Sequence, residues 1–253
     1  KILESKGVYP GIKVDKGAHP MDSSSSEKIT KGLDGLYERC VDFYKLGARF
    51  AKWRAVITIG EGIPTDECIQ ANASALAKYA KICQDANLVP IVEPEVLMDG
   101  NHTIEICYEV SEKTLRTTFN ELEKEGVYLP GILLKPNMVI SGKECSVQAD
   151  MNKVAQMTVK CLMASVPEEV PGIVFLSGGQ SETEATEHLN AMNAMGEYPW
   201  KLSFSYGRAL QQSALHSWGG NNANLATTYA VFYHRAEMNS KACHGEYSPE
   251  LEI

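Results

Sequence analysis

The sequence predicts an α/β fold, a (β/α)8 TIM barrel of which strands three to eight are present, as one domain over residues 1–253. Strand-like and helix-like segments alternate along the whole chain, as is typical of a parallel sheet with right-handed crossovers. Six strand segments are present, with centres about forty residues apart, which suits a barrel enzyme with long loops. Four of these strands carry paired polar residues at positions i and i+2, and such pairs point to one face of a strand.

The paired polar residues favour a barrel over an open, doubly wound sheet. Inward-facing side chains of neighbouring barrel strands meet one another, whereas on a doubly wound sheet they would lie beneath a helix. An unpaired buried charge is costly, so such residues need partners or a task. The pairs are Lys13 with Asp15, Lys52 with Arg54, Glu93 with Glu95, and Lys135 with Asn137. Because a barrel has eight strands, we expect two further units upstream of Lys1.

The first unit is an apolar strand over residues 8–15 followed by a helix. Ser24 and Glu27 stand in a capping-box arrangement before an apolar run, and a glycine follows that run. These signals predict a helix over residues 24–47 that ends at Gly47.

The second and third units show clearer periodicity. Strands are expected over residues 50–58 and 89–97, where apolar and β-branched residues predominate. A helix over residues 103–125 ends at a glycine. Another is predicted over residues 64–87, because its apolar residues form one stripe at helical spacing, namely Ile69, Ala73, Leu76, Ala80 and Cys83.

The remaining units continue the alternation to the end of the chain. Two of the last strands run into glycine-containing turns that lead directly into helices. In the last helix, Leu225, Tyr229, Phe232 and Ala236 share one face. We expect strands over residues 132–139, 172–177 and 201–206, and helices over residues 150–165, 181–195, 208–218 and 222–242.

Composition excludes several classes of function. The net charge of −8 and the pI near 5.3 exclude a general nucleic-acid binder but permit a local basic cluster for an anionic substrate. No run of eighteen apolar residues is present, so no membrane span is expected. Residues 1–7 are too polar for a signal peptide, and we expect a cytoplasmic protein, with a plastid or another organelle left open.

The reactive residue types show no metal or dinucleotide motif. The seven cysteines lack a C-x-x-C spacing and are expected to be free thiols in a reducing compartment. The six histidines are dispersed, so no metal site is expected. No G-x-G-x-x-G follows the first strand, which leaves a dinucleotide-binding fold unsupported and no cofactor expected.

Lys135 is the candidate nucleophile, since it lies inside an apolar strand. A lysine with the ordinary pKa of about 10.4 is almost fully charged at pH 7. Desolvation and the neighbouring charges of Lys52 and Lys13 would lower its pKa and expose a neutral amine. Such an amine attacks a carbonyl to form a Schiff base, an electron sink. The alternative is a structural lysine whose ammonium reaches solvent at the strand end.

Glu93 and Glu95 are candidate acid and base groups on one face of the third strand. Two carboxyl groups in different environments can donate and accept protons in turn. The alternative is that they only neutralise the lysines.

Two glycine-containing loops near the end of the chain predict a phosphate site. Each loop follows a strand and precedes a helix, where backbone N–H groups bind anions. In barrel enzymes, the loops after strands seven and eight commonly hold phosphate. The alternative is a pair of ordinary turns. The candidate residues are Ser177, Gly178, Ser205, Gly207 and Arg208.

At these residues the chain resembles the class I fructose-bisphosphate aldolases. The resemblance runs through the chain in order and rests on the segments GIKVDKG, GLDGLYERC, FAKWRAV, VPIVEPEVL, LLKPNMV, FLSGGQSE and FSYGRALQ. It implies a metal-independent aldolase of glycolysis and gluconeogenesis that cleaves fructose 1,6-bisphosphate reversibly into dihydroxyacetone phosphate and glyceraldehyde 3-phosphate.

The resemblance also implies a role for each site residue. Lys135 would form the Schiff base with the ketose, and Glu93 would shuttle protons. Lys52 would assist electrostatically, and Glu95 would support the same steps. Lys13 and Arg54 would hold substrate oxygens or the distal phosphate, and the glycine loops would hold phosphate.

Two features of the family have no counterpart in this sequence. An aspartate of the first barrel strand would lie upstream of Lys1, and a C-terminal tail ending in tyrosine is absent. The resemblance further implies a homotetramer, and binding of actin filaments and proton-pump subunits. Two rival functions remain, a Schiff-base lyase or transferase for a monophosphate, and a catalytically incomplete scaffold.

Overall fold

The computed structural model describes residues 1–23 and 26–252 and contains a six-stranded parallel sheet. Its strands lie side by side in the order in which they follow along the chain. In a doubly wound sheet that order reverses at a switch point, whereas in a barrel each strand adds on the same side. The strand order confirms the predicted fold, with six consecutive barrel strands: β1 (Gly11–Lys13), β4 (Phe50–Ile57), β5 (Val89–Val96), β6 (Leu133–Leu134), β7 (Gly172–Phe175) and β8 (Lys201–Phe204).

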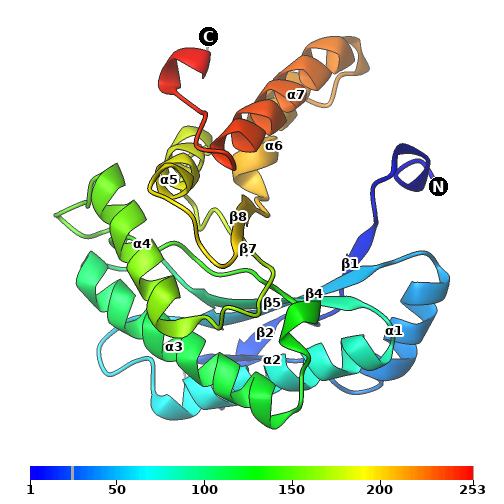
Figure 1. The fold of residues 1–253 in the computed structure, drawn as a ribbon, viewed down its shortest axis with the longest axis vertical. Coiled ribbons are helices and arrows are strands. Elements are labelled where there is room, and N and C mark those ends of the chain that lie inside the picture. Colours follow the sequence, from blue (N-terminus) through cyan, green and yellow to red (C-terminus); the bar gives the residue numbers. More distant parts are fainter. Residues whose placement is uncertain (24–25, 253) are drawn as a thin grey trace.

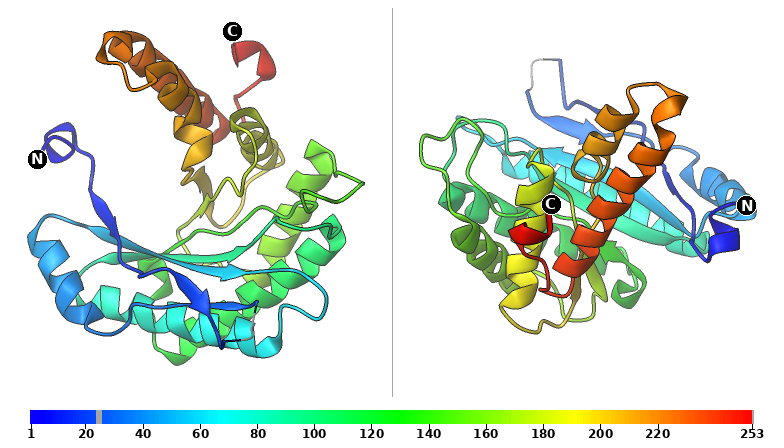
Figure 2. Two further views of the ribbon diagram at one scale, coloured as in Figure 1. Left: turned by 180° about the vertical axis from the view of Figure 1, so that it is seen from behind. Right: turned by 90° about the horizontal axis from the view of Figure 1, so that it is seen from above.

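Helices connect successive strands and cover the outer face of the curved sheet (Figure 1). Seen from behind and from above, α6 and α7 form a pair that stands beyond β8 (Figure 2). Within the described part of the chain, no helix combines the length and the apolar character needed to cross a membrane. The helices are α1 (Leu36–Lys45), α2 (Asp66–Asp85), α3 (Ile104–Lys124), α4 (Met151–Ser165), α5 (Glu182–Ala194), α6 (Arg208–Trp218) and α7 (Leu225–Ala242).

The core lies between the sheet and these helices. The apolar stripe predicted for α2 is buried, and α2 packs on β4 and β5, where the rings of Trp53 and Tyr79 stack at 5.5 Å. The predicted stripe of α7 lies elsewhere: Leu225, Tyr229 and Phe232 line an apolar groove beside α6. Tyr229 and Phe232 are exposed, and α7 buries Arg235, Met238, Asn239 and Ala242.

The helix predicted over residues 24–47 is wrong in its first half. The chain instead forms a hairpin of β2 (Ala18–Pro20) and β3 (Lys28–Thr30), and the helix begins at Leu36. Ser24, the first half of the expected capping box, lies outside the described residues. The carboxylate of Glu27 accepts hydrogen bonds from N and Oγ1 of Thr65, each at 2.7 Å, next to the start of α2.

The strand predicted over residues 132–139 is also too long, because β6 ends after two residues. Pro136 has no N–H to donate to a neighbouring strand. Asn137 replaces part of the ladder with its side chain, whose Oδ1 accepts a hydrogen bond from Val96 N at 2.9 Å and whose Nδ2 donates to Ser111 Oγ on α3. Asn137 therefore does not point the same way as Lys135, contrary to the i, i+2 expectation.

Candidate active site

The ends of the parallel strands surround a polar cavity of about 350 Å³. All the predicted site residues except Lys13 and Lys52 line it. They are Arg54 on β4, Glu93 and Glu95 on β5, Lys135 directly after β6, Ser177 and Gly178 after β7, and Ser205, Gly207 and Arg208 after β8. The carboxyl ends of parallel strands meet at one edge of a sheet, which is why residues so far apart in sequence converge.

Glu93 lies between two lysine ammonium groups. Its Oε1 is 3.2 Å from Lys135 Nζ, and its Oε2 accepts a hydrogen bond from Lys52 Nζ at 2.5 Å. The register of the sheet produces this arrangement, since Lys135 N donates to Val92 O at 2.7 Å. Lys52 therefore reaches the site through Glu93 although it does not line the cavity.

Lys135 is a mostly buried amine that forms one ion pair among the described residues, with Glu93. Its side chain is 11% exposed. Burial lowers the pKa of Lys135 below its ordinary value, and the positive charge of Lys52 adds to the effect, although Glu93 and Glu95 oppose it. A lowered pKa increases the fraction of neutral amine at neutral pH, and the neutral amine is the nucleophilic form.

Next to Lys135 and Glu93, Arg54 and Glu95 form a second ion pair, in which the cation keeps its charge. Arg54 Nε donates a hydrogen bond to Glu95 Oε2. Burial disfavours the charged guanidinium, but that hydrogen bond and the charges of Glu95, Glu93 and Asp15 outweigh it and raise the pKa of Arg54. Arg54 therefore stays a permanent cation at the wall of the cavity.

Lys13 does not line the cavity in which the sequence placed it. Its ammonium donates to Asp15 Oδ1 at 2.5 Å, and its side chain is 53% exposed. Asp15 is buried and also accepts hydrogen bonds from the N–H groups of Gly17, at 3.1 Å, and Arg54, at 3.3 Å. β1 ends at Lys13, and the Lys13 ammonium bonds to the carboxylate two residues further along instead of reaching the cavity.

The two glycine loops line one part of the cavity. Gly178 and Gly179 have φ angles of 54° and 79°, a left-handed conformation that glycine adopts without strain. Ser205 N donates to Phe175 O at 2.9 Å, which holds the loop after β8 against the end of β7. Arg208 follows as the first residue of α6.

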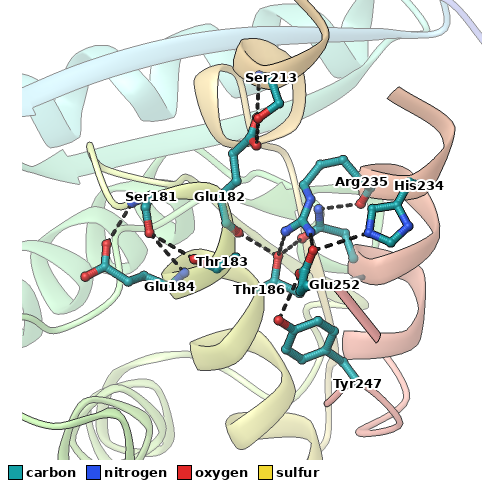
Figure 3. A network of polar contacts seen from close by, with 11 residues as sticks. Ser181, Glu182, Thr183, Glu184, Thr186, Ser213, His234, Arg235, Tyr247 and Glu252 are labelled. Carbon is teal, nitrogen blue, oxygen red and sulfur yellow. Dashed lines mark hydrogen bonds and ion pairs between the residues drawn. The ribbon is translucent and has the colours of Figure 1, made fainter. Parts of the chain in front are cut away.

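A network of polar contacts fixes the start of α5, and with it the loop after β7 (Figure 3). Ser181 and Glu184 form a capping box at this helix end. Glu182 accepts hydrogen bonds from Ser213 N, at 2.9 Å, and from Ser213 Oγ on α6. The helices that follow β7 and β8 are thereby tied together near the cavity.

Some residues of the cavity were not predicted as site residues. Met98 and Asp99 follow β5, and Lys143 lies in the long segment between β6 and α4. They occur in irregular segments without strand periodicity, so alternation could not find them. The segment that carries Lys143 is nevertheless a loop after a barrel strand, which is where barrel enzymes place functional residues. Among the described residues, no group of three or more histidine, cysteine or acidic side chains is arranged to hold a metal ion.

Comparisons with known proteins agree on one family. The family model of class-I fructose-bisphosphate aldolases matches residues 1–252. A probable fructose-bisphosphate aldolase class 1 of Xanthomonas campestris is 54% identical over 98% of this chain and 74% of its own length. Fructose-bisphosphate aldolase 2 of Plasmodium berghei is 52% identical over 97% of this chain and 67% of its own length.

A solved structure agrees in three dimensions. It is a ternary co-crystal structure of the fructose-bisphosphate aldolase from Plasmodium falciparum with TRAP and a small-molecule inhibitor. It superimposes with a TM-score of 0.96 and 52% identity, over 98% of this chain and 72% of that chain. Matches of this length and identity leave one assignment: the chain belongs to the class-I fructose-bisphosphate aldolases, which are lyases.

Proposed function

We propose that Lys135 performs the aldolase reaction by forming a Schiff base with C2 of fructose 1,6-bisphosphate. The observation that supports this is the mostly buried Lys135 ammonium 3.2 Å from Glu93, at the wall of a cavity with phosphate-binding features. The two groups supply the amine and the proton carrier that imine formation needs. Lys52 is less suited to attack, because it donates to Glu93 at 2.5 Å and does not line the cavity.

The reaction then follows from the chemistry of the imine. Glu93 takes a proton from the Lys135 ammonium, and the neutral amine adds to the C2 carbonyl to give a carbinolamine. Glu93 then returns that proton to the carbinolamine hydroxyl so that water leaves and the protonated imine forms. A base takes the proton of the C4 hydroxyl, the C3–C4 bond breaks, and its electrons move into the protonated imine. Glyceraldehyde 3-phosphate departs, the enamine is protonated at C3, and hydrolysis of the imine releases dihydroxyacetone phosphate.

The other polar residues position the substrate and stabilise charge. Lys52 would stabilise the carboxylate of Glu93 each time that group loses its proton. Glu95 holds Arg54 by a hydrogen bond, and Arg54 would bind substrate oxygens or the distal phosphate. Lys13, which is tied to Asp15, would reach the substrate only by leaving that ion pair.

The phosphate of C1 would bind between the two glycine loops. Ser177 and Gly178 after β7, and Ser205, Gly207 and Arg208 after β8, line one part of the cavity. Backbone N–H groups, hydroxyl groups and one guanidinium suit a phosphate dianion. Two cations, Arg54 on β4 and Arg208 at the start of α6, favour a bisphosphate over a monophosphate. A comparison of the turnover of fructose 1,6-bisphosphate and fructose 1-phosphate would test this preference.

Replacing Lys135 by methionine tests this proposal directly. The Lys135→Met variant should not cleave fructose 1,6-bisphosphate, while its thermal unfolding stays close to that of the parent protein. Lys153→Met is the matched control, because Lys153 lies on α4 and pairs with Glu105 at 3.2 Å. Cleavage at the parent rate by the Lys135→Met protein would disprove the assignment.

Three further properties are proposed from kinship alone. They are a cytoplasmic location, a role in glycolysis and a homotetrameric assembly. Light scattering after gel filtration would test the assembly. The co-crystal structure of the Plasmodium falciparum relative contains TRAP, so a protein partner is a second proposal for this chain. Binding of actin or pump subunits that survives in the Lys135→Met variant would separate such a scaffold role from catalysis.

A further inference from the structure

We propose that Lys143 is a substrate-binding residue that contacts the phosphate held by the glycine loop after β7. This inference rests on the proposed function, because it takes the loop around Gly178 and Gly179 as a phosphate site. It adds a cation that the strand pattern did not predict. The residue would act on affinity for phosphorylated ligands rather than on the chemistry at Lys135.

The backbone around Lys143 is held firmly by the loop after β5. Lys143 N donates to Met98 O at 2.9 Å, Gly142 N donates to His102 O at 2.8 Å, and Glu144 N donates to Gly100 O at 2.9 Å. Three hydrogen bonds between two loops fix where the Lys143 side chain starts. The site therefore does not depend on a freely moving segment.

The Lys143 ammonium lies directly over the glycine turn. A Cβ added to Gly179 would stand 2.9 Å from Lys143 Nζ and 3.0 Å from Met98 Sδ. Lys143, Met98 and Gly179 line both the cavity of about 350 Å³ and a neighbouring one of about 510 Å³, so they form the wall between the two. An anion on the N–H groups of this turn would lie next to that ammonium.

The positive charge of Lys143 is less well neutralised by a neighbouring carboxylate than the charges of the cations deeper in the site. Lys135 and Lys52 contact Glu93, and Arg54 is bonded to Glu95. The partner of Lys143 is Asp99, whose Oδ1 lies 3.8 Å away, and the two side chains are 45% and 66% exposed to solvent. An exposed ion pair of this kind contributes little free energy, so a phosphate can compete with Asp99 for the lysine.

Arg208 approaches the same region from the other loop. In the part of the chain that the structure describes, no ion pair is formed by Arg208. Lys143 and Arg208 thus line the cavity from the loops after β6 and β8, with the glycine turn of β7 between them. A phosphate dianion needs about two such cations for charge balance, and these two supply them.

Calorimetric titration with a hexitol 1,6-bisphosphate tests the inference. This polyol has no carbonyl group and cannot condense with an amine, so its binding is independent of the chemistry of Lys135. We expect Lys143→Met to raise the Kd about ten-fold and Lys143→Arg to restore it to within about three-fold of the parent value. Lys153→Met is the matched control, since Lys143 and Lys153 have side chains that are both 45% exposed.

The outcomes separate this inference from the proposed function. An unchanged Kd in Lys143→Met, or an equal rise in Lys153→Met, would overturn the role of Lys143. Failure of the parent protein to bind the hexitol bisphosphate would overturn the phosphate site itself. Failure to trap an imine at Lys135 would overturn the proposed chemistry and leave the titration result standing.

Discussion

The Nζ of Lys135 lies 3.2 Å from Oε1 of Glu93, across the parallel pair β5 and β6. The second oxygen of Glu93 binds Lys52 from β4. One carboxylate thus contacts two amines that come from the strands on either side. The arrangement makes the pKa of Lys135 depend on both Glu93 and Lys52.

This coupling predicts opposite pH shifts for two substitutions. Glu93 raises the pKa of Lys135, so Glu93→Gln should move the pH midpoint of amine reactivity to lower pH. Lys52 lowers that pKa, so Lys52→Met should move the midpoint to higher pH. The rate of covalent labelling of Lys135 by an amine-specific reagent, measured against pH, checks both signs. Shifts in the same direction would contradict the coupling.

Asp15 should contribute strongly to stability. It is buried and accepts hydrogen bonds from Lys13 and from two backbone N–H groups, so Asp15→Ala removes the acceptor of those two N–H groups and breaks the ion pair with Lys13. We expect the free energy of unfolding to fall by about 2 kcal/mol in urea titrations. Asp42→Ala is the control, because Asp42 is exposed and forms a solvent-exposed ion pair with Lys45 at 3.3 Å. It should change stability by about 0.5 kcal/mol or less.

Glu182 should position the two phosphate loops relative to each other. Glu182→Ala removes the acceptor for Ser213, which joins α5 to α6. We expect a loss of about 1 kcal/mol of stability together with weaker binding of the hexitol bisphosphate. Glu184→Ala removes the capping box of α5 alone and should lower stability without weakening binding. Equal affinity in both variants would show that the tie between the helices does not serve the site.

Glu252 should make the C-terminal contact sensitive to acid. It bonds to the buried Arg235 and accepts from Tyr247 Oη at 2.9 Å (Figure 3). Burial raises the pKa of Glu252, but these hydrogen bonds outweigh it and hold the pKa below its ordinary value. Its stabilisation is therefore fully present above the unfolded pKa of about 4.3 and is lost as the pH falls through the folded pKa.

Glu252→Gln should accordingly reduce stability at pH 7 and flatten its decline below about pH 4.3. Thermal unfolding followed between neutral and acid pH compares the two proteins. Parallel curves for the parent and Glu252→Gln would mean that the carboxylate does not contribute through its charge.

The parts of the fold that sequence could predict are those set by local periodicity. The stripe from Ile69 to Cys83 and the apolar strands around Trp53 and Val92 predict elements that the structure contains. The hairpin of β2 and β3 could not be found this way, because contacts distant in sequence support it. Thr30 Oγ1 donates to Arg54 O at 2.7 Å, and no signal near Thr30 indicates that partner.

In the site, too, local periodicity predicts some residues, and contacts between distant segments determine the others. Alternation along β4 and β5 places Arg54, Glu93 and Glu95 on the face that lines the cavity. Lys13 does not line the cavity, because β1 ends at this residue and its ammonium donates a hydrogen bond to the carboxylate of Asp15, two residues away. Lys143 was missed because loop residues follow no period, and only the hydrogen bonds between two loops place it at the cavity.

Reductive trapping is the most direct test of the central claim. The protein is incubated with dihydroxyacetone phosphate, reduced with borohydride, digested, and mapped by mass spectrometry. We predict a single substrate-dependent adduct on Lys135. An adduct on Lys52 or Lys13 instead, or no adduct at all, would contradict the assignment of Lys135 as the amine that forms the imine.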